Sequence, residues 1–90
     1  MNEAGYILIF SPTALEDIEY FKKTGHKKIL QKIERLLNEL IIHPQTGTGK
    51  PEKLKFELSG YWSRRISKEH RLIYRIEGSK VFILSLRGHY

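Results

Sequence analysis

Residues 44–90 carry side chains of the three kinds that can cleave RNA without a metal ion. Glu52 supplies a carboxylate, Arg71 a guanidinium and His89 an imidazole. The 2′-hydroxyl of RNA is a built-in nucleophile, so the protein needs only a base for its proton, an acid for the departing 5′-oxygen and cations for the charge on phosphorus. These residue types therefore suit metal-free cleavage of RNA, provided that the fold brings them together.

The pattern of apolar side chains predicts that the fold does so, because side chains two apart on a strand project to the same side of a sheet. The residues that suit the core are Leu54, Phe56 and Leu58, then Leu72, Tyr74 and Ile76, and finally Phe82, Leu84 and Leu86. The cations and the imidazole left for the opposite face are Lys55, Arg65, Arg71, Arg87 and His89. We expect them to form a cationic concavity beside the loop that carries Glu52.

Other chemistries fit the sequence less well. The carboxylates that follow Pro44 are scattered, without the paired spacing of metal ligands, at Glu52, Glu57, Glu69 and Glu77. A Ser-His-Asp hydrolase would need a G-x-S-x-G motif, which is absent, and the only Asp is Asp17. Lys50 is followed by Pro51 instead of the hydroxyl residue of a phosphate-binding loop. We therefore expect neither a metal nor a cofactor.

The positive charge is confined to the second half of the chain. Residues 1–43 contain six Lys/Arg and six Asp/Glu, whereas residues 44–90 contain ten and four, which accounts for the whole net charge of +6. Segregated cations are typical of a protein that binds a polyanion, although an acidic protein partner would be attracted to the same surface.

Length and composition predict one domain over residues 1–90. A hydrophobic content of 40%, with 11% aromatic residues, is enough for one core in a chain of this length. The absence of Cys removes disulfides and a thiolate nucleophile. No apolar run approaches the roughly 18 residues of a membrane span. We expect a cytoplasmic protein without a membrane partner.

Two helices are expected in the first half. Ser11-Pro12 is a helix start signal, Thr13 and Glu16 match a capping box, and residues 24–25 (Thr-Gly) end the segment. The second helix runs from His26 until Pro44 stops it, with an apolar stripe of Ile29, Leu30, Ile33, Leu36, Leu37, Leu40 and Ile41. That stripe favours packing against a sheet over a dimer interface.

Strands are expected on both sides of this helical hairpin. Residues 6–10 form a short apolar run, and residues 44–53 form a loop rich in Gly and Pro. Four further β-like segments, 54–58, 61–67, 71–76 and 80–87, are separated by connections short enough for hairpins. The predicted fold class is α+β, with two N-terminal helices packed on a mainly antiparallel sheet of about five strands in the order β-α-α-β-β-β-β.

Four motifs follow one another in the second half: GTGKPEKLK at 47–55, LSGYWSRRI at 58–66, EHRLIY at 69–74 and the terminal His89-Tyr90. In these motifs the chain resembles toxins of the YoeB/Txe family, within the RelE/ParE superfamily of bacterial type II toxin–antitoxin systems, from about residue 6 to residue 90. The resemblance implies a microbial-ribonuclease-like fold and a ribosome-dependent endoribonuclease that cuts messenger RNA in the decoding site. It also implies a YefM/Phd-type antitoxin as partner. Residues 1–5 precede the usual start of such toxins and are interpreted as an N-terminal extension.

The resemblance assigns roles to individual residues. It implies a general base at Glu52, a transition-state cation at Arg71, a general acid at His89 and a substrate-positioning residue at Tyr90. The residues expected to bind RNA are Lys50, Lys55, Arg64, Arg65 and Arg87. The products should carry a 2′,3′-cyclic phosphate and a 5′-hydroxyl.

Several alternatives stay open. The chain could be a gyrase-binding poison of the ParE type or a non-catalytic RNA-binding module, neither of which needs an acid–base pair. Arg64, Arg65 and Arg71 could be exposed strand residues in ion pairs with Glu57 or Glu69. The sequence does not show whether the protein forms a homodimer.

Overall fold

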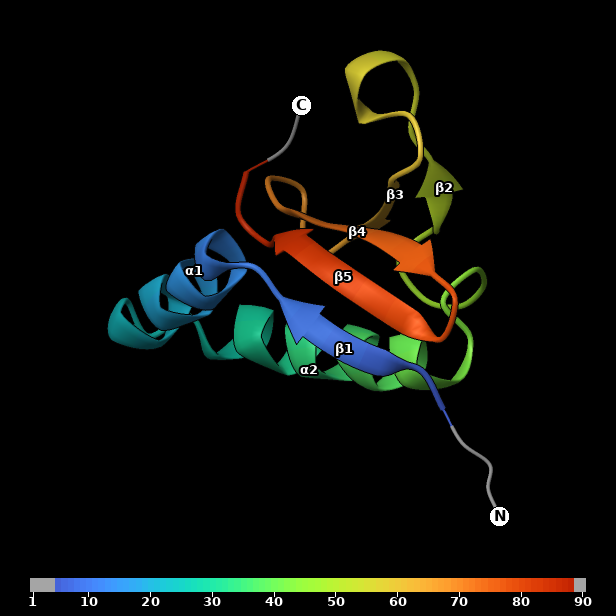
Figure 1. Ribbon diagram of the computed structural model, residues 1–90. Coiled ribbons are helices and arrows are strands. Elements are labelled where there is room, and N and C mark those ends of the chain that lie inside the picture. Colours follow the sequence, from blue (N-terminus) through green and yellow to red (C-terminus); the bar gives the residue numbers. More distant parts are fainter. Residues whose placement is uncertain (1–4, 89–90) are drawn as a thin grey trace.

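One sheet and one layer of two helices make up the part of the chain that the computed structural model describes, residues 5–88 (Figure 1). The helices are α1 (Pro12–Lys23) and α2 (Lys27–Ile42). The strands are β1 (Ile7–Phe10), β2 (Glu52–Lys53), β3 (Trp62–Arg65), β4 (Arg71–Glu77) and β5 (Lys80–Ser85), and one turn of 3₁₀ helix, η1 (Phe56–Leu58), follows β2. Neither helix in this part of the chain is long and apolar enough to cross a membrane.

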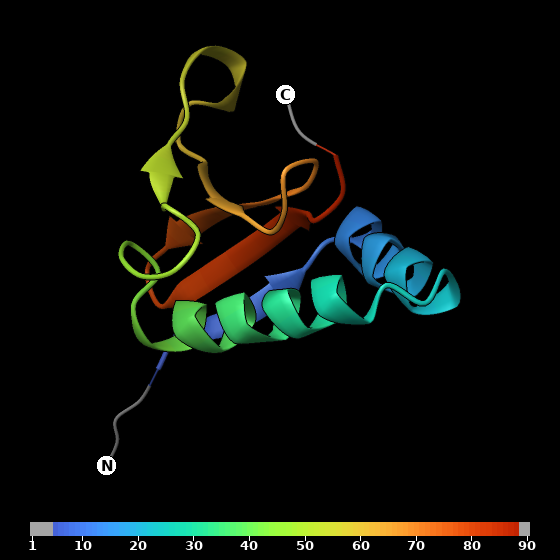
Figure 2. The same cartoon turned by 180° about the vertical axis from the view of Figure 1, so that it is seen from behind.

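The five strands lie in the order β1-β5-β4-β3-β2. Strand β1 is parallel to β5, and the other neighbouring pairs are antiparallel. Both helices cover one face of this sheet, as Figure 2 shows with α2 running across it, and we call the opposite side the helix-free face. The predicted α+β class, with its order of elements and its mainly antiparallel sheet, is confirmed.

Helix α1 begins two residues earlier than the capping-box interpretation requires. Ser11 is the N-cap: its hydroxyl accepts the amide of Ala14 at 3.0 Å and donates to the carbonyl of Leu84 at 2.7 Å. Pro12 occupies the first helical position, where its missing N–H costs nothing. Thr13 therefore lies inside the helix, and the predicted capping box at Thr13 and Glu16 is wrong.

The apolar stripe of α2 packs into the core as predicted. Ile33, Leu36 and Leu40 are buried, and Ile29, Leu30 and Leu37 are partly buried against the core. The sheet's contribution to the same core is Leu72, Tyr74, Val81, Ile83 and Leu86, and α1 adds Ala14 and Phe21. The core thus lies between the helices and the sheet, which leaves the helix-free face available for a site.

The predicted strand at residues 54–58 is wrong. Strand β2 ends at Lys53, and residues 56–58 turn into η1, with no buried side chain. Phe56 has φ 58° and is 87% exposed, so it does not join the core as alternation had suggested. Glu52, predicted in a loop, instead pairs with β3 as an edge-strand residue.

Along most of β5, the side chains point to the opposite faces of the sheet from those predicted. Val81 and Ile83 are the buried residues, whereas Phe82 and Leu84 lie half-buried on the helix-free face. A register irregularity between Ile73 and Tyr74 lets Leu86 return to the core. Apolar residues on both faces of β5 made its alternation ambiguous, and a bulge shifts the register without a signal in the pattern.

Candidate active site

The pairing of β2, β3 and β4 brings Glu52, Arg65 and Arg71 to the helix-free face. Glu52 lies opposite Ser63, and Arg65 lies opposite Arg71. Ser63 and Arg65 are two residues apart and share a face, so their partners share it too. Glu52 and Arg65 are diagonal neighbours, a relation that places residues about 7–8 Å apart. Three of the predicted site residues therefore occupy one corner of the sheet.

Arg65 and Arg71 form a like-charge pair directly across two strands. Such a pair destabilises a sheet unless a counter-charge is present. Among residues 5–88 the ion pairs join Arg35 and Arg64 to Glu39 and Arg75 to Glu77, so no carboxylate there neutralises either member. The cross-strand ion pairs of Arg65 and Arg71 with Glu57 or Glu69, which the sequence left open as an alternative, do not form among the described residues. Two cations beside Glu52 suit the binding of an anion such as a phosphate.

Arg71 is held in place by the turn between β3 and β4. Its Nη1 donates to the carbonyl of Ser67 at 2.9 Å and to that of His70 at 3.2 Å. The Ser67 hydroxyl in turn accepts the amides of Glu69 and His70, both at 3.2 Å. Neutral carbonyls orient the guanidinium without cancelling its charge, which is what a cation for a developing negative charge requires.

Arg64 does not bind RNA in this fold, contrary to our prediction. Its side chain is fully buried beneath the sheet, on the face opposite to Arg65. Its Nη2 donates to the carbonyls of His43 at 2.8 Å and Thr46 at 2.7 Å, and its Nε donates to the Tyr74 hydroxyl at 3.2 Å. Strand alternation separates it from its neighbour, so adjacent arginines have different roles. Arg64 fastens the loop after α2 to the sheet.

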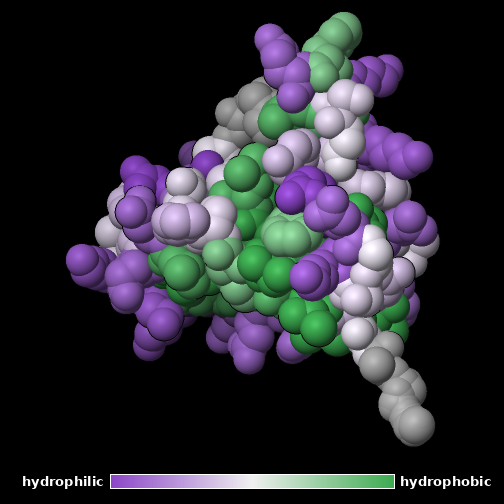
Figure 3. Space-filling model, in the orientation of Figure 1, coloured by the Kyte–Doolittle hydropathy of each residue, from purple (hydrophilic) through white to green (hydrophobic). Residues whose placement is uncertain are grey.

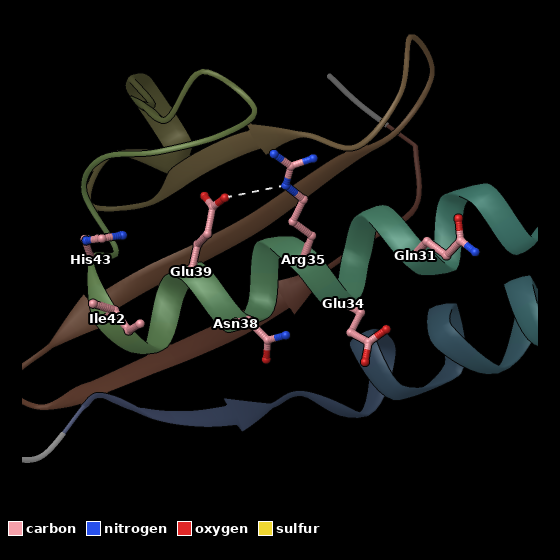
Figure 4. A pocket seen from close by; sticks show the side chains of 7 residues that line it. All are labelled: Gln31, Glu34, Arg35, Asn38, Glu39, Ile42 and His43. Atoms are coloured by element: carbon pink, nitrogen blue, oxygen red, sulfur yellow. Dashed lines mark ion pairs between the residues drawn. The ribbon is translucent and has the colours of Figure 1, made fainter.

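Glu39 completes this buried cluster. Its Oε1 accepts from Arg64 Nη1 and from the Thr48 amide, both at 2.8 Å, and its Oε2 accepts from the Thr48 hydroxyl at 2.6 Å. Burial would raise the pKa of the Glu39 carboxyl, but the hydrogen bonds from Thr48 and the charge of Arg64 outweigh burial, so the pKa lies below its ordinary value. Figure 4 shows Glu39 projecting from α2 toward the following loop and paired with Arg35. The Arg35 Nε atom lies 3.9 Å from Glu39 Oε2.

The hollow in Figure 4 has a volume of about 420 Å³ and runs along the outer side of α2. Its lining includes Glu34 and Glu39 as well as Arg35. Carboxylates repel a polyanion, and the hollow belongs to the helix layer. It is therefore no extension of the cationic corner on the helix-free face.

Gly49 joins the fastened loop to the site. Its carbonyl accepts the Arg65 amide at 2.7 Å, its φ is +84°, and an added Cβ would lie 2.9 Å from the Arg65 carbonyl oxygen. Only glycine fits so close an approach at that backbone angle. Lys50 follows directly and is exposed, so this predicted RNA-binding cation is the residue next to the contact with Arg65.

The other predicted cations lie at the margins. Lys55 precedes η1 and is exposed, but no strand places it on the helix-free face, so the alternation argument for it is wrong. The Arg87 guanidinium lies 3.6 Å from the ring centroid of Tyr20 on α1 and is directed toward the helix instead of toward Arg71. Both side chains are open to solvent.

The C-terminal segment approaches the site from β5. His89 and Tyr90 lie outside the described residues, so their predicted roles stay predictions. Gly88 is described: its amide donates to His70 Nδ1 at 2.8 Å, and its carbonyl accepts the Arg71 amide at 3.0 Å. His70 had no predicted role, and only its position in the motif EHRLIY, beside Arg71, could have drawn attention to it.

The helix-free face has a second, apolar part over β1 and β5. Figure 3 shows hydrophobic residues gathered at its centre with hydrophilic ones around them. A hollow of about 190 Å³ there is lined by Ile9, Phe82 and Leu84, together with Tyr61 and Arg75. The Arg75 guanidinium lies 4.2 Å from the Phe82 ring centroid. The face therefore combines a cationic corner with an apolar floor.

Comparisons with known proteins agree with this geometry. Toxin YoeB of Mycobacterium bovis is 48% identical over 81 residues, which are 90% of this chain and 94% of that protein. The solved YoeB dimer of Staphylococcus aureus is 44% identical with a TM-score of 0.85, over 97% of this chain and 100% of that one. A YoeB–YefM complex from the same organism matches over the same shares at 44% identity with a TM-score of 0.83. Residues 10–90 match the model of the YoeB-like toxin of bacterial type II toxin–antitoxin systems, and the chain belongs to that family.

Proposed function

We propose that this toxin is a ribosome-dependent endoribonuclease that cuts messenger RNA in the decoding site and so inhibits translation in the cytoplasm. The observation that carries the proposal is the cross-strand pair of Arg65 and Arg71 beside Glu52. Like charges held opposite each other cost stability, and an RNA phosphate between them removes that cost. A phosphate bound there would lie within reach of a carboxylate.

In the proposed reaction Glu52 removes the proton of the 2′-hydroxyl, and the 2′-oxygen attacks the adjacent phosphorus. The bond from phosphorus to the 5′-oxygen breaks as His89 gives that oxygen a proton. Arg71 and Arg65 stabilise the negative charge on the phosphorane. The products are a 2′,3′-cyclic phosphate and a 5′-hydroxyl.

Other residues would bind and orient the RNA. Lys50, Lys55 and Arg87 are exposed cations and would contact phosphates on either side of the cut. Tyr90 would position the nucleotide at the cut. The RNA supplies the nucleophile and the protein the acid and base, so the scheme needs neither a metal nor a cofactor.

We also propose a YefM-type antitoxin as the inhibitor of this chain. The Staphylococcus aureus relative forms a complex with YefM and also a dimer. A net charge of +6 favours an acidic segment that competes with RNA for the same cations. A homodimer is the corresponding proposal for the free toxin.

The test replaces the 2′-hydroxyl of the nucleotide 5′ to the cut with hydrogen in a ribosome-bound message. Cleavage should stop while binding persists, because affinity comes largely from phosphate contacts. Glu52→Gln should lower the cleavage rate by about 10²-fold or more. The matched control is Glu57→Gln, which changes an exposed carboxylate on η1 and should leave the rate unaltered.

The same assay separates the alternatives. A gyrase-binding poison would produce no fragments from the message and would inhibit supercoiling instead. A non-catalytic RNA-binding module would bind the message and leave it whole. Undiminished cleavage of the deoxy-substituted message would overturn the roles given to Glu52 and His89.

A further inference from the structure

We propose that His70 is a positioning residue that fixes the main chain at Gly88, the residue before the proposed acid. The inference rests on the proposed function, because it affects cleavage only if His89 is the acid. It adds a residue to the machinery: an imidazole that touches no substrate and acts through the backbone of Gly88.

The main chain of Gly88 is bound on both sides by consecutive residues of β4 and its preceding turn. The Gly88 amide donates to His70 Nδ1 at 2.8 Å. The Arg71 amide donates to the Gly88 carbonyl at 3.0 Å. One bond fixes the peptide that enters Gly88 and the other fixes the peptide that leaves it toward His89.

The hydrogen bond from Gly88 also defines the state of the His70 ring. A ring nitrogen that accepts a hydrogen bond carries no proton, so the neutral ring has its proton on Nε2. We call the hydrogen bond from the Gly88 amide to His70 Nδ1 the clasp. The clasp therefore depends on one nitrogen atom of one side chain.

His70 itself is rigidly held. Its carbonyl accepts the amides of Ile66 at 3.0 Å and Ser67 at 3.2 Å, which closes the turn. Its ring meets the buried ring of Phe21 edge-on, with 5.0 Å between centroids. A side chain fixed at both its backbone and its ring loses little freedom when it binds, so it can position the segment that it holds.

Two further contacts guide the chain from β5 to this clasp. The Leu86 amide donates to Asp17 Oδ2 at 2.9 Å in a buried position. Arg87 stacks on Tyr20 at 3.6 Å from its ring centroid. Three successive residues are thus held by α1 and by the β3–β4 turn, and the last of them, Gly88, takes a φ of +79° that glycine adopts without strain.

These contacts matter because a catalytic group must be placed accurately. Consecutive Cα atoms are about 3.8 Å apart, so a fixed Gly88 confines the start of the next residue. The Arg71 amide makes the second bond to Gly88, so the same residue presents the proposed cation and holds the segment with the proposed acid. Loss of the His70 bond would let the entering peptide of Gly88 rotate and would move that acid relative to Arg71.

The experiment compares two variants of His70 in the full chain. His70→Leu removes the acceptor and keeps an apolar side chain against Phe21, whereas His70→Asn places an amide oxygen near the position of Nδ1. Hydrogen exchange of the Gly88 amide, measured by NMR on the ¹⁵N-labelled protein, reports the bond directly. Cleavage of a ribosome-bound message gives kcat and KM for the same samples.

We expect His70→Leu to expose the Gly88 amide to exchange and to lower kcat by about 10²-fold with little change in KM, the scale that a small misplacement costs. His70→Asn should restore both the protection of the amide and most of kcat. The matched control is His43→Leu, since His43 is an exposed histidine at the end of α2, and it should change neither measurement.

Three results would overturn the proposal. The first is an unchanged exchange rate of the Gly88 amide in His70→Leu, and the second is faster exchange of that amide with an unchanged kcat. The third is a reduced kcat in His70→Asn while the Gly88 amide stays protected from exchange. Amide exchange needs no RNA, so the clasp is tested even if the toxin cuts nothing. Failure of the proposed function would instead appear as wild-type protein that does not cleave the message.

Discussion

Replacing the buried Arg64 by methionine should destabilise the protein far more than the same change at Arg65. The Arg64 guanidinium binds Glu39, Tyr74 and three loop carbonyls, and its side chain is 0% exposed. Arg64→Met keeps much of the volume but removes the cation that is paired with Glu39 and the donor that binds the loop carbonyls of His43 and Thr46. Removing one member of a buried pair costs about 3–5 kcal/mol.

That loss is a large part of the stability of a small domain, which is about 5–15 kcal/mol. With a slope of about 1.5 kcal/mol per M, the urea midpoint should fall by about 2–3 M. Arg65→Met, one residue along the same strand, changes an exposed side chain and should stay within about 0.5 kcal/mol of the wild type. Urea unfolding followed by circular dichroism measures both variants.

A double-mutant cycle with Glu39→Leu tests whether the cost comes from the ion pair. Once Glu39 is gone, Arg64→Met should cost less, with a coupling energy of about 0.5–3 kcal/mol. Equal midpoints for Arg64→Met and Arg65→Met would refute the assignment of Arg64 to the interior. So would a folded Arg64→Met protein whose only defect is weaker RNA binding.

Two further predictions concern stability. The pKa of Glu39 is lowered in the folded state, so the stability that its charged form contributes is complete above the unfolded pKa of about 4.3 and is lost as pH falls through the lower folded pKa. In Glu39→Gln the free energy of unfolding should therefore depend less on pH in that range. The same pH dependence as in the wild type would contradict the ion pair of Glu39 with Arg64. Phe56 has φ 58° and is 87% exposed, so Phe56→Gly should raise the free energy of unfolding by about 0.5–1 kcal/mol, and a lower melting temperature would show that its ring packs against the fold.

The helices and the order of elements could be predicted because they depend on local patterns. The stripe of α2 repeats at the helical period, and Pro44 marks the helix's end. The same reasoning gave a wrong prediction for residues 54–58. Leu54 and Leu58 fit the apolar alternation of a strand, but the backbone between them takes a left-handed conformation at Phe56. A binary pattern of apolar and polar residues carries no information about such a turn when no glycine marks it.

The candidate site was predicted in part for a related reason. Glu52, Arg65 and Arg71 meet on one face because strand register brings them there, and alternation alone could indicate Arg65 and Arg71. Arg64 was misassigned because its partners come from α2, the following loop and β4, and the sequence does not show that they converge. A charged residue is seldom fully buried, so the sequence alone favoured an exposed position for Arg64.

The adjacent arginines explain how a sheet can tolerate repulsion at its corner. Because successive side chains on β3 point to opposite faces, Arg64 fastens the loop after α2 from behind while Arg65 faces Arg71 in front. The fastened loop ends at Gly49, whose carbonyl holds the Arg65 amide, and three residues later Glu52 pairs with the same strand. The stabilising cluster and the destabilising pair are therefore joined by one short stretch of backbone. Weakening the Arg64 cluster should make the backbone at Arg65 more mobile. The cleavage rate of Arg64 variants should therefore decrease together with the exchange protection of the Arg65 amide.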